Sequence, residues 1–187
     1  MAVRPARPVI PAVTAEVIKL VTLPSVRLTV ALTWAVTVLL RLVDPPGGVV
    51  RYSQVGVLVL GVLAAGHEYQ SGGQVRSTLL AVPRRPLLIA AKCFALVVTA
   101  GPPVFVAALL AGAPGATGGL LVDLLLAAGV ATIVRHPVGA TAALLTAYQM
   151  VVPLIRANLP EVALPPAPVW AAAVVAAAAV TFLLREA

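Results

Sequence analysis

The chain has 187 residues, of which 61% are hydrophobic and 10% are charged, and its mean hydropathy is +1.06. A soluble domain carries about 25% charged residues and could not bury this much apolar surface, so the composition excludes that class and predicts a polytopic membrane protein. The net charge is +7, but the basic residues lie at the ends of apolar runs, which indicates anchoring at the bilayer surface and no nucleic-acid partner.

The N-terminal region predicts a tail followed by an interfacial helix. Residues 1–13 contain three prolines in place of the apolar run of a cleavable signal peptide, so we expect a disordered tail and an uncleaved first span. Thr14 is suited to cap a helix. Apolar residues at positions 13, 17, 20 and 21 form one stripe, with Glu16 and Lys19 off it. Residues 14–23 therefore predict an amphipathic helix in the membrane interface; the alternative is a frayed cytosolic extension.

Six apolar segments predict an all-α fold with one transmembrane domain over residues 14–187. A helix rises 1.5 Å per residue and the hydrocarbon core is about 30 Å thick, so about 20 residues are needed per crossing. The predicted spans are residues 26–43, 49–66, 87–110, 120–134, 138–155 and 169–184. Pro102-Pro103 is expected to interrupt the third span, and residues 112–119 to form a loop.

Basic residues divide unevenly between the two sides that six spans define. One side has ten: Arg4, Arg7, Lys19, Arg27, Arg76, Arg84, Arg85, Lys92, Arg135 and Arg185. The other side has three: Arg41, Arg51 and Arg156. Because cytoplasmic loops are enriched in Lys and Arg, both termini and the segment 67–85 are predicted to be cytosolic.

The segment His67–Lys92 concentrates charge in an otherwise apolar chain. Placing its four basic groups at the bilayer centre would cost about 12 kcal/mol, at about 3 kcal/mol each, so it should lie in water or at the interface. Residues 74–82 predict a short helix ended by Pro83, and Gly72-Gly73 allows a sharp turn before it. Glu68 is a lone acid among bases and is suited to cap this helix or to meet a basic partner.

No pattern for catalysis or metal binding is present, so we expect neither an enzyme nor a cofactor in this chain. The sequence contains no nucleotide-binding glycine loop with its lysine and no H-E-x-x-H or G-x-S-x-G motif. Its one cysteine, Cys93, excludes an intrachain disulfide, and His67 and His136 stand alone. Asp123 is the one acid well inside a span; it either lines a polar path, faces headgroups or pairs locally.

The segment between the second and third predicted spans forms a composite motif. It reads Glu68-Tyr69-x-x-Gly72, then Gln74-Val75-Arg76-Ser77-Thr78-Leu79, then Val82-Pro83-Arg84-Arg85 and Ala91-Lys92. Weaker motifs lie at the two ends: Glu16, Lys19-Leu20 and Ser25, and Leu183-Leu184-Arg185-Glu186-Ala187. Together they resemble the ABC-2 type transporter permeases, the membrane subunits of ABC exporters, and most of all those of actinobacteria.

The resemblance implies that residues 68–82 form a coupling helix that docks on a separate ATPase subunit, with the 14–23 helix as a second contact. The implied coupling residues are Glu68, Tyr69, Gly72, Gly73, Arg76, Leu79, Pro83, Arg84, Arg85, Glu16 and Lys19. ATP and Mg²⁺ would bind the partner ATPase and not this chain. One of the two adjacent glycines is an insertion relative to the family spacing, and the outer segments 44–48 and 156–168 are short for the family.

The expected function is that of an exporter subunit for a hydrophobic or amphiphilic molecule in a bacterial plasma membrane. It would act as a dimer of permease chains, a homodimer in preference to a heterodimer, with two ATPase chains. One alternative is an immunity or scaffold protein that binds a cytosolic partner without transport. Another is a small secondary transporter, which would need an ion-coupling site at Asp123.

Overall fold

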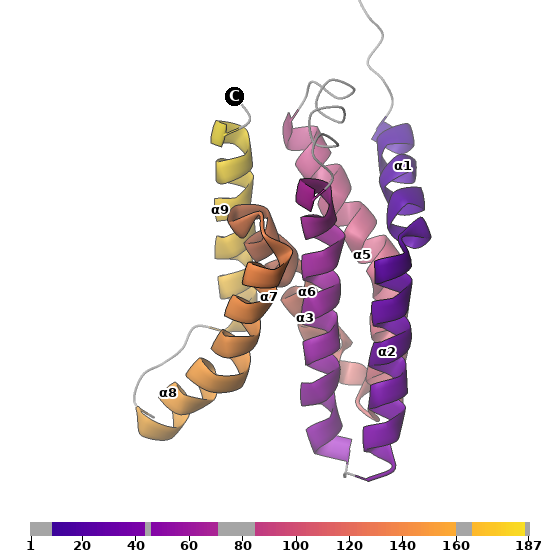
Figure 1. The fold of residues 1–187 in the computed structure, drawn as a ribbon, viewed down its shortest axis with the longest axis vertical. Coiled ribbons are helices and arrows are strands. Elements are labelled where there is room, and N and C mark those ends of the chain that lie inside the picture. Colours follow the sequence, from indigo (N-terminus) through magenta and orange to yellow (C-terminus); the bar gives the residue numbers. More distant parts are fainter. Residues whose placement is uncertain (1–8, 44–45, 71–84, 160–165, 186–187) are drawn as a thin grey trace, which may run out of the picture.

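The computed structural model describes residues 9–43, 46–70, 85–159 and 166–185, and every regular element in these ranges is helical (Figure 1). The all-α prediction is therefore confirmed for the described chain. The elements are α1 Val9–Thr22, α2 Pro24–Arg41, α3 Pro46–Gln70, α5 Arg85–Leu110, a 3₁₀ turn η1 Pro114–Ala116, α6 Thr117–Val134, α7 Pro137–Thr146, a π-helical turn η2 Ala147–Val151, α8 Val152–Asn158 and α9 Ala167–Arg185.

Four helical segments of the described chain are long and apolar enough to cross a membrane: Gly48–His67, Ile89–Leu110, Pro114–Val134 and Pro137–Asn158. A fifth candidate is the bent pair Val13–Thr22 and Pro24–Arg41, which qualifies only when its two helices are taken together. Helix α2 contains Arg27 and Arg41, the two arginines at the ends of the first predicted span, and they lower its hydropathy. The described apolar part of α9, Pro168–Thr181, is shorter than 18 residues and so reaches less than about 27 Å. The protein is thus membrane-embedded with four or five such helices, and the predicted six crossings are not confirmed.

The first helix differs from its prediction in extent. It begins at Val9 and not at Thr14, so residues 9–13 are helical where a tail was predicted. Pro11 is tolerated because it falls in the first turn, where a backbone N–H has no intrahelical acceptor. The chain bends by 63° between α1 and α2. Val21 is exposed and the side chain of Glu16 is largely covered, so in the bundle Glu16 lies toward α5 while part of the apolar stripe faces outward.

Pro102-Pro103 does not interrupt the third predicted span, since α5 continues through both prolines to Leu110. Prolines are tolerated in membrane helices where neighbouring helices hold the weakened turn in place. Here the next turn is packed, with Val104, Ala107 and Ala108 all buried. The indole Nε1 of Trp34 also donates a hydrogen bond to the Pro103 carbonyl over 3.0 Å, which ties α2 to α5.

Helix α3 is the centre of the bundle because glycines at intervals of five residues admit three neighbouring helices. A methyl group at Gly56 would collide with Thr33 of α2. One at Gly61 would lie 2.5 Å from the Leu124 carbonyl oxygen of α6, and one at Gly66 would lie 3.1 Å from Cβ of Pro137 in α7. Small residues at such seams let membrane helices approach closely.

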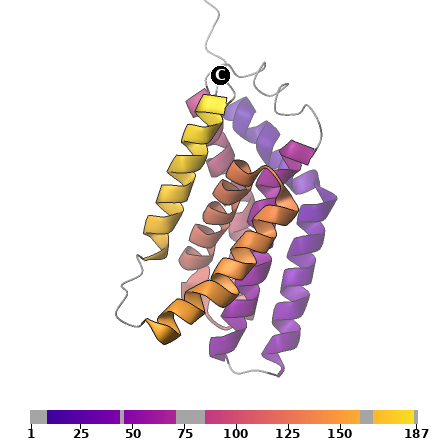
Figure 2. The same ribbon diagram turned by 60° about the vertical axis from the view of Figure 1, so that its left-hand side comes forward.

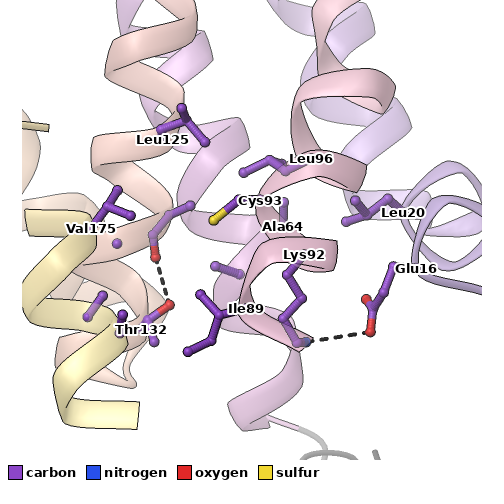
Figure 3. Close-up of a pocket in the computed structure, with 15 residues that line it drawn as sticks. Glu16, Leu20, Ala64, Ile89, Lys92, Cys93, Leu96, Leu125, Thr132 and Val175 are labelled. Carbon is purple, nitrogen blue, oxygen red and sulfur yellow. Dashed lines mark hydrogen bonds and ion pairs between the residues drawn. The ribbon is translucent and has the colours of Figure 1, made fainter. Parts of the chain in front are cut away.

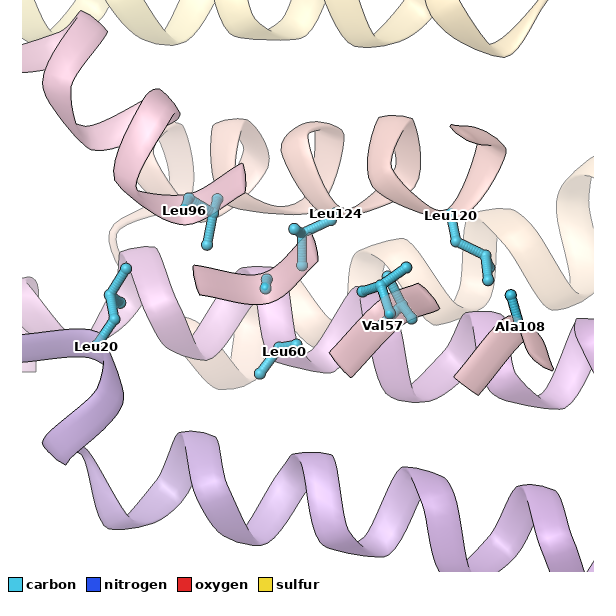
Figure 4. Close-up of a cluster of buried hydrophobic side chains, with 9 residues drawn as sticks. Leu20, Val57, Leu60, Leu96, Ala108, Leu120 and Leu124 are labelled. Atoms are coloured by element: carbon cyan, nitrogen blue, oxygen red, sulfur yellow. The ribbon is translucent and has the colours of Figure 1, made fainter. Parts of the chain in front are cut away.

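The apolar core runs along α3, α5 and α6 (Figure 4). Its members are Leu20, Val57, Leu60, Leu96, Ala100, Val104, Ala108, Leu120 and Leu124. A second cluster joins α3 and α6 to α7 and α9, around Leu58, Val62, Ala127 and Leu144. The segment α7–η2–α8 runs obliquely to the other helices (Figures 1 and 2).

The bundle has two distinct ends. The "α1 end" holds α1, the last turn of α3, the first turn of α5 and the C-terminal turn of α9 (Figure 1). The "far end" holds the last turn of α2, the first turn of α3 and the 3₁₀ turn before α6. Both chain ends as described therefore lie at the α1 end.

Candidate functional site

Most of the predicted coupling residues lie outside the part of the chain that the structure describes. This holds for Gly72, Gly73, Arg76, Leu79, Pro83 and Arg84. Glu68 and Tyr69 belong to the last turn of α3, and Arg85 is the first residue of α5, but their side chains are also outside it. Glu16 and Lys19 are described on α1.

The ion pair between Glu16 and Lys92 joins α1 to the start of α5. The Nζ atom of Lys92 lies 3.6 Å from the Oε1 atom of Glu16. The two side chains are 25% and 12% exposed, respectively, so the pair is shielded but reachable by solvent. Helix α1 packs along α5 and buries Leu20 one turn beyond Glu16. The segment after α3 therefore leads directly into a helix that is held to α1 by charge and by apolar contact.

This ion pair lies on the rim of a cavity of about 110 Å³, here called the Lys92 cavity (Figure 3). Five helices contribute to its walls: α1, α3, α5, α6 and α9. Small and aliphatic residues form most of the lining, including Ala64, Leu96, Leu125 and Val175. Thr132 adds a hydroxyl, but that group donates to the carbonyl of Ala128 in its own helix over 2.9 Å. The cavity is therefore apolar inside and charged at one edge.

A second polar group, here called the Asp123 cluster, joins three helical segments nearer the far end. Asp123 of α6 is only 5% exposed. Its Oδ2 atom accepts a hydrogen bond from Nε2 of Gln54 in α3 over 2.7 Å, and its Oδ1 atom accepts one from the Tyr148 hydroxyl over 2.9 Å. Of the alternatives for Asp123, local pairing is thus the one observed.

The π-helical turn Ala147–Val151 presents Tyr148 to this cluster. The next residue, Gln149, accepts a hydrogen bond on Oε1 from Nε of Arg51 over 3.0 Å. A π turn rotates the following residues relative to a regular helix and recurs at functional sites. On the other side of α3, the buried hydroxyls of Thr37 and Ser53 lie 2.9 Å apart. Side-chain hydrogen bonds therefore fix α3 to α2, α6 and the π turn.

The sequence indicated the charged residues but not their partners. Asp123 stood out as an acid inside a span and Lys92 as a base near a span entry. No motif marks Gln54 or Tyr148, although a polar side chain within an apolar span is itself a signal that it meets a partner. No sequence pattern indicates the Lys92 cavity, because most of its lining residues are of the same types as the rest of the core.

Among the described residues, no three His, Cys, Asp or Glu side chains lie close enough together to hold a metal ion. No protein-family model matches the chain, and neither does any curated protein or any solved structure.

Proposed function

We propose that this chain is the transmembrane permease subunit of an ATP-driven ABC exporter. It moves a hydrophobic or amphiphilic small molecule by alternating access, and separate ATPase subunits supply the energy. The permease chains form a dimer, preferentially a homodimer, in the plasma membrane of a bacterium. ATP and Mg²⁺ bind the ATPase subunits.

The observation that carries the proposal is the way the 71–84 segment is flanked. It follows α3, the helix at the centre of the bundle, and it precedes α5, which is tied to α1 by Glu16 and Lys92. A force applied to such a connection reaches both helices, because each is packed along its length against others. The basic residues and the glycine pair of this segment, together with Glu68, form the motif that resembles the coupling element of the permease family.

In this proposal the α1 end faces the cytosol and the chain crosses the membrane six times. Helices α2 and α9 supply the two crossings beyond the four that qualify alone, and α1 lies in the interface as a second contact for the ATPase. Four described basic residues lie toward the α1 end, namely Lys19, Arg27, Lys92 and Arg135, and three lie toward the far end, namely Arg41, Arg51 and Arg156. This uneven division supports the orientation, since cytosolic segments are enriched in basic residues.

The test is purification of the tagged chain from its native membrane in a mild detergent. The expected result is a retained ATPase subunit whose ATP hydrolysis is measurable in the purified complex. Glu68→Arg is expected to reduce the amount of retained ATPase about tenfold, since a reversed charge at a docking contact costs about 1.4 kcal/mol or more. Glu161→Arg is the matched control, because it makes the same charge change in the connection between α8 and α9, and it should leave retention unchanged.

Two outcomes would overturn the proposal. A preparation that retains no ATPase contradicts a coupling role, and so does equal retention by Glu68→Arg and the unmodified chain. A retained cytosolic partner without ATP hydrolysis would instead identify a scaffold or immunity protein. Loss of transport in Asp123→Asn with no ATPase present would identify an ion-coupled secondary transporter.

A further inference from the structure

The Lys92 cavity needs an occupant that is apolar for most of its length. Its lining offers few free polar partners, and a water molecule requires two to four of them to be held in a cavity. A cavity of about 150 Å³ lined by aliphatic residues stays dry and holds benzene. At about 110 Å³, the Lys92 cavity has room for a short section of an acyl chain but not for a whole lipid.

The charged side chains at the edge of the cavity determine which polar group an occupant can place there. Of the described residues that line the cavity, one is positive and one is negative, with Nζ of Lys92 and Oε1 of Glu16 only 3.6 Å apart. An anion that approached Lys92 would be repelled by Glu16, and a cation that approached Glu16 would be repelled by Lys92. A molecule that carries both a phosphate and an ammonium group satisfies both side chains at once. The charges at the edge are therefore complementary to a zwitterion.

We propose that the Lys92 cavity binds a zwitterionic phospholipid. A section of one acyl chain fills the cavity, the phosphate accepts hydrogen bonds from the Lys92 ammonium, and the lipid ammonium donates to the Glu16 carboxylate. The site lies where α1 meets α5, so a bound lipid stabilises the contact between these helices. Lipid is the committed occupant because the surrounding helices are embedded in a bilayer, where phospholipid is the most abundant amphiphile. This inference rests on membrane embedding and not on the proposed transport function.

The first experiment measures which lipid stays bound. The full chain is placed in nanodiscs that contain equal amounts of phosphatidylethanolamine and phosphatidylglycerol with the same acyl chains, and native mass spectrometry then identifies the retained lipid. We expect phosphatidylethanolamine to be enriched about fivefold, the effect of about 1 kcal/mol from two partly exposed charge contacts. Equal retention of the two lipids, or enrichment of phosphatidylglycerol, would overturn the proposal.

Single-charge variants make the headgroup assignment specific. Glu16→Gln removes the repulsion of an anion, so its preference is expected to shift to phosphatidylglycerol. Lys92→Gln removes the partner of the phosphate and leaves Glu16 in place, so both lipids are expected to be retained less and phosphatidylglycerol is expected to gain nothing. Arg41→Gln removes one positive charge at the far end and should retain the preference of the unmodified chain. If Glu16→Gln and Arg41→Gln behave alike, the ion pair does not select the headgroup and the proposal fails.

The second experiment reports on the cavity itself and keeps the lining intact. Cys93 lines the cavity beside Lys92 and is the one cysteine in the sequence (Figure 3). Its alkylation by N-ethylmaleimide is expected to be about fivefold slower in nanodiscs of phosphatidylethanolamine than in those of phosphatidylglycerol, in proportion to the same occupancy difference. The control moves the cysteine to the exposed Ala90 of the same helix, as Cys93→Ala with Ala90→Cys, and its rate should be the same in both lipids.

A larger side chain that fills the Lys92 cavity should abolish the enrichment of phosphatidylethanolamine. Ala128→Leu places an isobutyl group in the cavity, and the retained phosphatidylethanolamine is expected to fall to the level of phosphatidylglycerol. Ala90→Leu makes the same substitution on an exposed face and should retain the enrichment. Undiminished enrichment in Ala128→Leu would place the lipid elsewhere and contradict the proposal.

Discussion

The Lys92 cavity and the Asp123 cluster use charge in opposite ways. In the cluster, a carboxylate that is 5% exposed accepts two hydrogen bonds of 2.7 and 2.9 Å from two different helical segments. At the cavity, a carboxylate and an ammonium lie 3.6 Å apart, with side chains that solvent still reaches. Short bonds to a buried anion fix the helices that make them, whereas a longer and partly exposed pair contributes less to holding its two helices together.

The difference assigns rigidity to one part of the bundle and adaptability to the other. Helix α3 is fixed to α2 by Thr37 and Ser53, and to α6 by Gln54 and Asp123. Helices α1 and α5 enclose one side of the cavity and meet across an ion pair. A transporter that alternates access needs such a contrast, since one part of each chain must move while the rest keeps its packing.

The largest effect is expected where α3 and α6 touch, because this contact supports both regions. Gly61→Leu places its Cβ atom 2.5 Å from the Leu124 carbonyl oxygen and 2.9 Å from Cβ of Ala127. The helices must separate, so we expect a loss of about 3 kcal/mol or more in the free energy of unfolding. Thermal unfolding in detergent, followed by loss of the monodisperse species, measures it.

Gly119→Ala is the control for this substitution. Gly119 is exposed in the first turn of α6, and a methyl group there would meet nothing within 4 Å. The expected change is neutral or stabilising by up to about 1 kcal/mol, because alanine favours a helix over glycine. Equal losses in Gly61→Leu and Gly119→Ala would show that the α3–α6 contact has no special part in the fold.

The second largest effect is expected at Asp123. Asp123→Ala leaves the Gln54 amide and the Tyr148 hydroxyl without their shared acceptor, and we expect a loss of about 2 kcal/mol. Asp123→Asn keeps an acceptor oxygen and should cost about half as much. Glu16→Ala should lower the free energy of unfolding by less than either Asp123 substitution. If Glu16→Ala proves the more damaging substitution, the rigid and adaptable regions have been assigned the wrong way round.

Composition and periodicity predicted much of the fold, because a bilayer permits few alternatives. Five of the six predicted spans correspond closely to α2, α3, α5, α6 and the segment α7–η2–α8, and α9 matches the sixth within its described range. What the pattern could not give is the number of crossings. That number depends on whether α1 and α2 form one bent span, since the chain bends by 63° where Leu23 is extended and Pro24 begins α2.

The polar partners were harder to predict for a physical reason. A hydrogen bond between Gln54 and Asp123 joins residues 69 positions apart, so it depends on helix rotation and not on local spacing. Helix rotation is set in turn by close approaches such as the one at Gly61. The coupling residues between Gly72 and Arg84 lie outside the described residues, so their assignment stays a prediction.

A smaller effect is expected from Tyr148→Phe, which removes one of the two donors and keeps the ring. The Asp123 carboxylate then retains only the Gln54 bond, and we expect a loss of about 1 kcal/mol. A double-mutant cycle with Asp123→Ala should give a coupling energy of about 0.6 kcal/mol, the average for hydrogen bonds between membrane helices, and no more than about 1.7 kcal/mol. Tyr52→Phe is the control, because Tyr52 is exposed, and its cycle with Asp123→Ala should show no coupling.

The smallest effect is expected at the edge of the Lys92 cavity. The Glu16–Lys92 pair is long at 3.6 Å and partly exposed, and pairs of this kind contribute about 0.5 kcal/mol, so Lys92→Gln should shift the thermal midpoint by only a degree or two. Added salt should weaken the unmodified chain slightly and leave Lys92→Gln unaffected, because screening acts on charges that solvent reaches. A loss of 2 kcal/mol or more, insensitive to salt, would mean that the pair clamps α1 onto α5. The α1 end would then be as rigid as the Asp123 cluster, and its opening could no longer admit a lipid.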